Sequence, residues 1–292
     1  MSEIKTAKAG PGWFGILWRS GLRLALIGVF IVVVMLICVW WTAPAVGPAR
    51  EIFHGVVYEC RQVSGPEGSG KAHLIRVDLK EPGIELYLTP ESPEARAAGA
   101  EYETRWGPRV AREEGLAVAI NGVLFNASMK NVLPGSHVKA IETLIVDHKV
   151  NHEYGPQSLI WFDENLSPRL ELGRPPSREV MAKARWAIGS QLVIYRNRAV
   201  SQYAGNNPDA RTLVGIDEGQ KLLYFGVFEN ASAIAATQML ADFGACEIVP
   251  MDGGSSTMLT FGPGAKGVSS GAAIYPLRSL PVFVGIRAKP LQ

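Results

Sequence analysis

The longest hydrophobic stretch of the chain is residues 24–41, LALIGVFIVVVMLICVWW, in which none of the eighteen positions is charged. A stretch of this length can cross a bilayer as an α-helix, and it exceeds the apolar region of an ordinary cleaved signal peptide. Its hydrophobic residues would cover every face of a helix, which disfavours a helix packed on a soluble core. The pattern therefore predicts a transmembrane anchor over residues 24–41.

The residues before this stretch predict its orientation. They include four basic residues and one acidic residue: Lys5, Lys8, Arg19, Arg23 and Glu3. The positive-inside bias makes residues 1–23 a short cytoplasmic segment of a single-pass membrane protein. The sequence Ala43-Pro44-Ala45 resembles a cleavage site, so a cleaved signal remains an alternative. Both interpretations place the later residues in the periplasm or outside the cell.

Beyond residue 55 the hydrophobic pattern changes from one long run to short runs with period two. Residues 73–79 (HLIRVDL) and 84–88 (IELYL) alternate hydrophobic and polar positions, which predicts half-buried strands. Residues 143–172 contain four short runs separated by turns, which predicts two hairpins. Residues 42–55 are interpreted as a linker between the anchor and this region.

Helices are fewer than strands in the predicted ectodomain, residues 56–292. Residues 92–114 are rich in Ala, Arg and Glu and favour helix, although Pro108 limits its length. Residues 233–243 have helical spacing, a capping serine at Ser232 and a glycine after the last turn. We therefore expect an α+β fold with a mixed, mostly antiparallel sheet and a few helices, preceded by one transmembrane helix.

Charge excludes one class of partner. With the first 23 residues set aside, 25 Lys and Arg residues face 26 Asp and Glu residues. This near-neutral balance lacks the basic excess that phosphate backbones of nucleic acids require, so no nucleic-acid partner is expected.

Three cysteines are present. Cys38 lies in the apolar stretch, whereas Cys60 and Cys246 lie in the exported part, where an oxidising compartment would permit a disulfide. Their separation in sequence does not decide whether they pair. The chain has no CxxC pair, which argues against the common zinc and thioredoxin-like sites.

The strongest candidate for chemistry follows an apolar run at residues 247–251. That run ends in Asp252-Gly253-Gly254-Ser255-Ser256-Thr257-Met258. Paired glycines allow positive φ angles and close approach of backbone N–H groups to a ligand, and such a nest suits an anion. Asp252 suits acid/base chemistry at the strand end. Taken alone, an ordinary Asp-Gly turn is the simpler interpretation.

Three further segments place polar residues at strand ends. Asn121-Gly122 follows a predicted buried strand, and Gly189-Ser190 ends another. Arg211 opens the strand RTLVGID at residues 211–217. Each of these segments alone is typical of an ordinary turn or strand end.

Together the motifs resemble the phosphodiester glycosidase family. The family has NGGFF-like, RTAIGI-like and DGGGSST-like motifs, and this chain has NGVLF at 121–125, RTLVGI at 211–216 and DGGSSTM at 252–258 in that order. The resemblance covers roughly residues 70–288. The chain departs from the family at Val123, at Leu124, in having two glycines rather than three, and in a short link at residues 228–232.

The resemblance implies a substrate in which a sugar similar to N-acetylglucosamine is joined through its anomeric carbon to a phosphodiester, as in a phosphodiester-linked glycan or glycopolymer. Asp252 is then the acid/base or nucleophile, with a pKa raised near the phosphate, and Glu229 is the candidate second carboxylate. No cofactor is expected, and a divalent metal near Asp252 stays open. The implied substrate-binding residues are Arg211, Asn121, Gly122, Gly189, Ser190, Gly253, Gly254, Ser255, Ser256 and Arg278.

We expect Arg211, whose planar fork can donate two hydrogen bonds to phosphate, to meet Asp252 over one glycine-lined anion pocket. The enzymatic interpretation, a membrane-anchored hydrolase acting on an envelope glycopolymer, depends on that meeting. Two alternatives remain: a carbohydrate- or phosphopolymer-binding module that lost its chemistry, and an accessory protein of exopolysaccharide assembly. The departures in NGVLF and the short link favour the binding module, whereas intact Asp252, Arg211 and Ser256 favour the enzyme.

Overall fold

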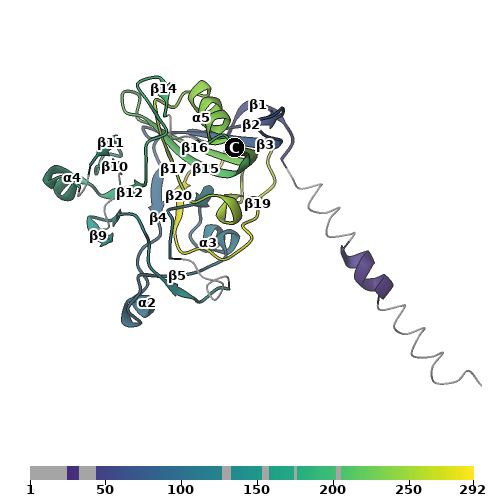
Figure 1. Ribbon diagram of the computed structural model, residues 1–292, viewed down its shortest axis with the longest axis horizontal. Helices are drawn as coiled ribbons and strands as arrows, with labels where there is room; N and C mark the ends of the chain where they lie inside the picture. The colour runs from purple at the N-terminus through teal and green to yellow at the C-terminus, as the bar shows by residue number, and fades with distance from the viewer. Residues whose placement is uncertain (1–24, 33–43, 127–132, 153–157, 174–175, 202–204) are drawn as a thin grey trace, which may run out of the picture. The chain divides into compact units, whose positions relative to one another are not determined.

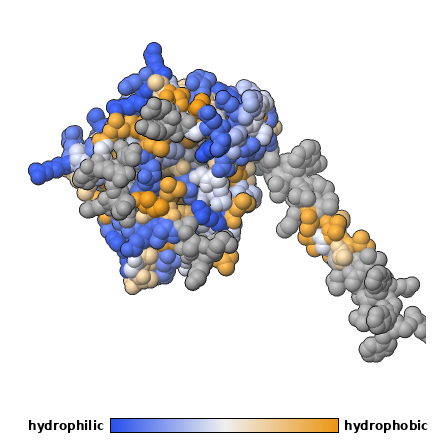
Figure 2. All heavy atoms as spheres, in the orientation of Figure 1, coloured by the Kyte–Doolittle hydropathy of each residue, from blue (hydrophilic) through white to orange (hydrophobic). Residues whose placement is uncertain are grey.

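The computed structural model describes residues 25–32, 44–126, 133–152, 158–173, 176–201 and 205–292, in two compact units, Met1–Ala43 and Pro44–Gln292. In the first unit, residues 25–32 are helical, and Figure 2 shows them as mainly hydrophobic. None of the described helices is both long enough and apolar enough to cross a membrane. Residues 1–23 and the rest of the expected anchor, residues 24 and 33–41, lie outside the described residues.

The second unit is built on three larger sheets and one small one (Figure 1). The largest has eight strands in the spatial order β1 (Gly47–Phe53), β2 (Val56–Val63), β3 (Gly70–Asp78), β16 (Leu222–Ala231), β15 (Asp209–Asp217), β17 (Glu247–Pro250), β13 (Tyr195–Arg196) and β14 (Ala199–Val200). Strand β1 occupies part of the expected linker, residues 42–55, because it pairs with β2. The folded unit thus begins earlier in the chain than residue 56.

The other sheets complete the β structure. The second has five strands in the order β19 (Gly271–Ile274), β18 (Leu259–Phe261), β6 (Val118–Asn121), β20 (Phe283–Arg287) and β4 (Glu85–Leu88). The third has β11 (Pro168–Leu172), β10 (Ser158–Phe162), β12 (Trp186–Ser190), β8 (Leu144–Val146) and β9 (Lys149–His152), and the small sheet has β5 (Tyr102–Glu103) and β7 (His137–Val138). The two hairpins expected over residues 143–172 are confirmed.

The fold is α+β and antiparallel. Every strand pairing among the described residues is antiparallel, so the expected mixed sheet is corrected to an antiparallel one. Hairpins and returning connections account for this, because parallel neighbours would need longer crossovers.

Short helices join the strands: α2 (Pro93–Ala97), α3 (Gly107–Glu113), α4 (Arg178–Lys183), α5 (Ala233–Asp242) and the 3₁₀ turn η2 (Gly254–Ser256). The helical stretch expected over 92–114 is divided into α2, β5 and α3, since Pro93 and Pro108 each favour the first turn of a new helix. Helix α5 begins as expected, with the Ser232 hydroxyl accepting a hydrogen bond from the N–H of Ala235.

Two hydrophobic cores lie on opposite faces of the eight-stranded sheet. Val214 of β15 belongs to the larger core, shared with the sheet that contains β6 and β20. Leu213, its neighbour, belongs to the core beneath α5. Because successive side chains of a strand point to opposite faces, each residue near the end of β15 or β17 is committed to one of these two sides.

The two described cysteines carry free thiols. Cys60 is buried in the larger core, whereas Cys246 is exposed just before β17. The structure therefore shows no disulfide between Cys60 and Cys246.

Candidate active site

Asp252 lies two residues beyond the end of β17 and is paired with an arginine. Its Oδ2 accepts a hydrogen bond from Nη2 of Arg278 at 3.3 Å, and the same guanidinium donates to the buried Ser256 hydroxyl from Nη2 at 2.6 Å and from Nε at 3.0 Å. The Arg278 guanidinium also lies 4.7 Å from the centre of the Phe125 ring. Its Nη1 has no protein partner in the described part of the chain, so it remains able to bind an anion.

The Asp252 carboxyl is poorly solvated. Its side chain is only 9% exposed, and burial raises its pKa, against the opposing effects of the Ser256 hydrogen bond and the Arg278 charge. The direction agrees with the sequence-based expectation, although its cause is burial rather than a bound phosphate.

Asn121 holds the strand end that carries Asp252. Its Nδ2 donates to the Asp252 carbonyl at 2.6 Å, and its Oδ1 accepts from the Thr212 hydroxyl at 2.7 Å and from the Met258 N–H at 3.0 Å. The side chain is buried, so these contacts occupy the amide groups that were expected to bind the substrate. Asn121 therefore joins β6, β15 and the Asp252 turn.

A second carboxyl, Glu142, reaches this site from the loop before β8. Its Oε1 accepts from Nε2 of Gln191 at 3.0 Å, while its Oε2 is buried and has no hydrogen-bond partner among the described residues. Burial raises the pKa of Glu142 to about 7, and the charge of nearby Asp252 adds to the increase. Two carboxyls with raised pKa values thus lie within electrostatic reach of one another.

Backbone pairing explains how Glu142 arrives there. The segment after β6 pairs with the segment after β7, since the N–H of Ile141 donates to the Leu124 carbonyl and the N–H of Asn126 donates to the Lys139 carbonyl. Glu142 follows directly and is turned inward.

The end of β12 closes the other side. The Ser190 hydroxyl donates to the Pro250 carbonyl at 2.7 Å, which ties β12 to the end of β17. Gly189, Ser190, Glu142, Gln191 and Pro250 line a cavity of about 50 Å³ together with Val123, Leu124 and Met251. The structure therefore brings the predicted residues Gly189 and Ser190 to the same site as Asp252.

The glycine turn is arranged as a partial nest. Gly254 has φ +57°, but the Gly253 N–H donates to the Asp252 Oδ1 at 3.0 Å. The N–H groups of Gly254 and Ser255 meet no acceptor among the described residues. Gly122 lies behind the turn, because its carbonyl accepts from the Asp252 N–H and a Cβ there would collide with Val282.

Arg211 does not meet Asp252, and this expectation is wrong. Its Nε donates to the Ala231 carbonyl at 3.3 Å and its Nη2 to the Asn207 carbonyl at 2.8 Å. On β15 it stands opposite Phe228, which belongs to the core beneath α5, whereas the next residue, Thr212, faces Asn121. Strand alternation therefore sends Arg211 to the other face of the sheet, and the condition that the enzymatic interpretation placed on Arg211 is not met. An enzymatic interpretation now depends on Arg278, whose guanidinium meets Asp252 instead.

Glu229 also lies elsewhere. It is exposed near the end of β16, and its Oε2 accepts from the Lys71 N–H of the neighbouring strand β3 at 2.8 Å. No contact joins it to Asp252 among the described residues. The nearby second carboxyl is Glu142, which sequence reasoning missed; its only signal was an acidic residue inside the apolar run AIETLIV at 140–146.

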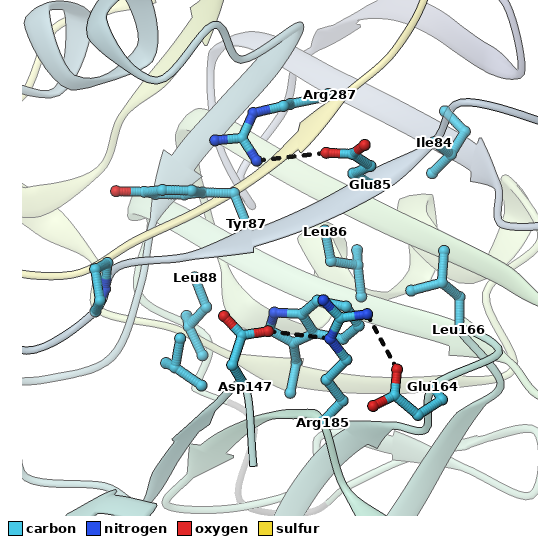
Figure 3. Close-up of a pocket in the computed structure, with 13 residues that line it drawn as sticks. Ile84, Glu85, Leu86, Tyr87, Leu88, Asp147, Glu164, Leu166, Arg185 and Arg287 are labelled. Carbon is cyan, nitrogen blue, oxygen red and sulfur yellow. Dashed lines mark hydrogen bonds and ion pairs between the residues drawn. The ribbon is translucent and has the colours of Figure 1, made fainter. Parts of the chain in front are cut away.

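A large pocket lies apart from this site. It has a volume of about 540 Å³ and lies between β4 and β20 on one side and β8 and β12 on the other. Figure 3 shows two arginines on opposite walls, Arg287 paired with Glu85 and Arg185 paired with Asp147 and Glu164. Because each carboxylate of this pocket is paired with an arginine, the pocket offers no reactive group comparable with Asp252 or Glu142. The described residues contain no group of three or more His, Cys, Asp or Glu side chains suited to a metal.

Solved structures with a similar fold come from organisms as different as a fish and two bacteria. The catalytic domain of zebrafish N-acetylglucosamine-1-phosphodiester alpha-N-acetylglucosaminidase, auto-inhibited by its pro-peptide, is similar with a TM-score of 0.58 and 14% identity over 85% of this chain and 87% of that one. A hypothetical protein from Synechocystis gives a TM-score of 0.52 and 13% identity over 80% of this chain and 62% of that one. A Burkholderia pseudomallei protein described as exported gives 0.51 and 10%, covering 75% of this chain and 74% of that one.

The similar structures show only the fold, whereas the sequence comparison identifies the family. No curated protein sequence matches the chain. The family model described as phosphodiester glycosidase matches residues 114–287, which is more than half of the chain and includes Asn121, Glu142, Asp252 and Arg278. The chain belongs to the phosphodiester glycosidase family.

Proposed function

We propose that this protein hydrolyses the bond between the anomeric carbon of a sugar and a phosphate oxygen in a sugar-1-phosphodiester. The observation that carries the proposal is the Asp252–Arg278 pair at the end of β17, in a chain of this family. The zebrafish protein with a similar fold acts on N-acetylglucosamine joined to a phosphodiester, which supports a sugar of that type.

Arg278 is the proposed phosphate ligand. Its Nη1 is free of protein partners among the described residues, and the rest of its fork is held by Ser256 and Asp252. A guanidinium held in this way binds phosphate oxygens with little loss of side-chain freedom. It also stabilises the charge that collects on the phosphate as the C1–O bond breaks.

The two carboxyls are assigned different tasks. Arg278 favours the ionised form of Asp252, whose negative charge stabilises the positive charge that develops at the anomeric carbon. Glu142 has no cation beside it among the described residues and a pKa of about 7, which suits a general base that removes a proton from the attacking water. The water oxygen then bonds to C1, and the phosphate monoester leaves with the electron pair of the broken bond.

A hydrolysis assay tests the proposal. The full chain is incubated with the methyl diester of N-acetylglucosamine-1-phosphate, and released N-acetylglucosamine is measured. We expect turnover by the wild type and a loss of at least about a hundredfold in Asp252→Asn. Glu229→Gln is the matched control, because that carboxylate lies away from the site, and it should retain activity. A chain that binds the diester and releases no sugar would instead be a binding module.

We further propose that residues 24–41 anchor the protein in a membrane, with the N-terminus in the cytoplasm and residues from Pro44 onward in the periplasm or outside the cell. The uncharged stretch and the four basic residues before it support this proposal. Recovery of the full chain in the membrane fraction after carbonate washing is the expected result, and release into the wash would contradict it.

A further inference from the structure

Exposed hydrophobic side chains gather around the Asp252–Arg278 pair. Among the described residues from 44 onward, eight large hydrophobic side chains are exposed, and five of them belong to segments that meet at this pair: Trp106, Leu124, Leu133, Tyr275 and Leu277. Leu277 is 79% exposed and Tyr275 is 62% exposed. We call these five residues the apolar collar.

Backbone contacts place the first part of the collar beside the reaction centre. The N–H of Leu277 donates to the Ser255 carbonyl at 2.8 Å, and Leu277 directly precedes Arg278. Leu124 directly precedes Phe125, whose ring lies under the Arg278 guanidinium, and it also lines the small cavity with Glu142. Leu124 and Leu277 therefore belong to two separate segments that meet at Arg278.

The other members lie on the next segments outward. Arg105, the neighbour of Trp106, exchanges backbone hydrogen bonds with Leu280, two residues beyond Arg278. The Thr104 hydroxyl donates to the Leu133 carbonyl at 2.9 Å, which places Leu133 beside the same segment. In Figure 2, hydrophobic surface interrupts the hydrophilic surface on the side where Figure 1 labels α3 and β19.

The position of the collar indicates its occupant. A single exposed leucine is ordinary, but several around one reactive centre mark a binding surface. A phosphodiester carries two groups, the sugar and the alcohol on the other phosphate oxygen. The polar residues Glu142, Gln191 and Ser190 line the small cavity of about 50 Å³, which has room for a polar substituent but not for a whole sugar ring. We assign the sugar to that polar side, and this assignment leaves the collar for the second group.

We propose that the collar binds the apolar chain of a lipid alcohol, so that the substrate class is a sugar-1-phosphodiester of a lipid. This inference rests on the proposed function and names its substrate class. The single guanidinium receives the phosphate, and Leu277, Tyr275 and Trp106 remove the first methylene groups of the chain from water. An amphiphilic substrate of this kind would also be held at the surface to which residues 24–41 are proposed to attach the protein.

The test compares two diesters of N-acetylglucosamine-1-phosphate, one with a methyl group and one with a decyl chain. The full chain is placed in lipid nanodiscs, and kcat/KM is measured for both. We expect the wild type to favour the decyl diester at least tenfold. Replacing the two most exposed members together, Tyr275→Ser and Leu277→Ser, should reduce this ratio to within about twofold of unity, because roughly 0.8 kcal/mol is lost for each methylene left in water.

A matched control separates the collar from surface hydrophobicity in general. Leu172 is 49% exposed on β11 and belongs to none of the segments that meet Arg278, so Leu172→Ser should keep the wild-type ratio. Equal use of both diesters by the wild type would overturn the lipid inference while leaving the proposed function intact. Hydrolysis of neither diester would remove the proposed function and this inference with it.

A final arm addresses the membrane itself as the occupant. If the double variant loses activity on both diesters in nanodiscs but not in detergent, and keeps the decyl-to-methyl ratio, the collar contacts the bilayer and the proposal is wrong. A ratio that is lost in nanodiscs and in detergent alike supports it.

Discussion

The Asp252 site and the large pocket of Figure 3 differ in how their charges are satisfied. In the large pocket, Arg185 donates to Asp147 and Glu164 and stacks 4.0 Å from the Trp186 ring centre, while Arg287 meets Glu85 and Glu114. At the Asp252 site one arginine faces Asp252, and Glu142 is buried with no cation beside it in the part of the chain that the structure describes. The larger pocket is therefore not the more reactive site, because its charged side chains are more fully paired with opposite charges.

The physical difference lies in the cost of desolvation. An exposed carboxylate with an arginine partner is stabilised in its charged form, whereas a buried carboxyl without a partner favours the protonated form. Hence the pKa of Glu164, beside His148 and Arg185, is lowered, while that of Glu142 is raised to about 7. Only the second group exchanges protons near neutral pH, which is what acid/base catalysis requires.

The largest expected difference is between two variants in which an arginine of one region, Arg278 or Arg287, is replaced by methionine. Arg278→Met should lower kcat/KM for the methyl diester by about a hundred- to a thousandfold, since the main phosphate ligand and the partner of Asp252 are both lost. Arg287→Met removes an arginine from the large pocket and should leave kcat/KM within about twofold. Steady-state kinetics of the two purified variants measures the comparison, and similar losses in both would contradict the assignment of the site.

Glu142 provides a test through pH. Its ionised form is the proposed base, so wild-type kcat should rise as pH increases through about 7. Glu142→Gln should lower kcat by about a hundredfold and abolish this rise. Glu164→Gln, in the large pocket, should keep both the rate and the profile. A Glu142→Gln enzyme that still shows the same rise would assign the ionisation to another group.

Asn121 should affect stability more than any polar residue of the large pocket. Asn121→Ala leaves the Met258 N–H, the Thr212 hydroxyl and the Asp252 carbonyl without their partner, which should lower the free energy of unfolding by about 2–3 kcal/mol. Denaturant unfolding measures the loss. A change below about 0.5 kcal/mol would show that these groups find other partners and that Asn121 does not hold the turn.

The smallest effect is expected in the large pocket itself. Arg185→Met removes two exposed ion pairs, which contribute little in water, and should change the unfolding free energy by less than about 1 kcal/mol. Its kcat/KM should equal that of the wild type. A loss of activity in this variant would mean that the pocket takes part in substrate binding.

Much of the fold follows from local patterns in the chain. Alternating runs at 73–79 and 84–88 predicted the strands β3 and β4, short runs predicted the two hairpins between 143 and 172, and Ser232 marked the start of α5. The order of the three motifs was enough to indicate the family. These features depend on residues close together in sequence, where periodicity and capping act directly.

The sequence was a poorer guide to which residues form the site. Motif position placed Asp252, Ser256, Gly189, Ser190 and Arg278 in one group, and the structure brings them together. It also placed Arg211 and Glu229 there, and both side chains lie elsewhere. A motif records that a residue matters near a strand end, but it does not record which face of the sheet its side chain occupies.

By itself the sequence determined the α+β class, the strand that ends in Asp252 and membership of the family, because these depend on composition and short-range pattern. Only the tertiary structure decided that Arg278 rather than Arg211 pairs with Asp252, and that Glu142 is the second carboxyl. Those choices arise from strand alternation, from the pairing of residues 124–126 with 139–141, and from burial without a counter-charge. All three are properties of segments that are distant in the chain and adjacent in the fold.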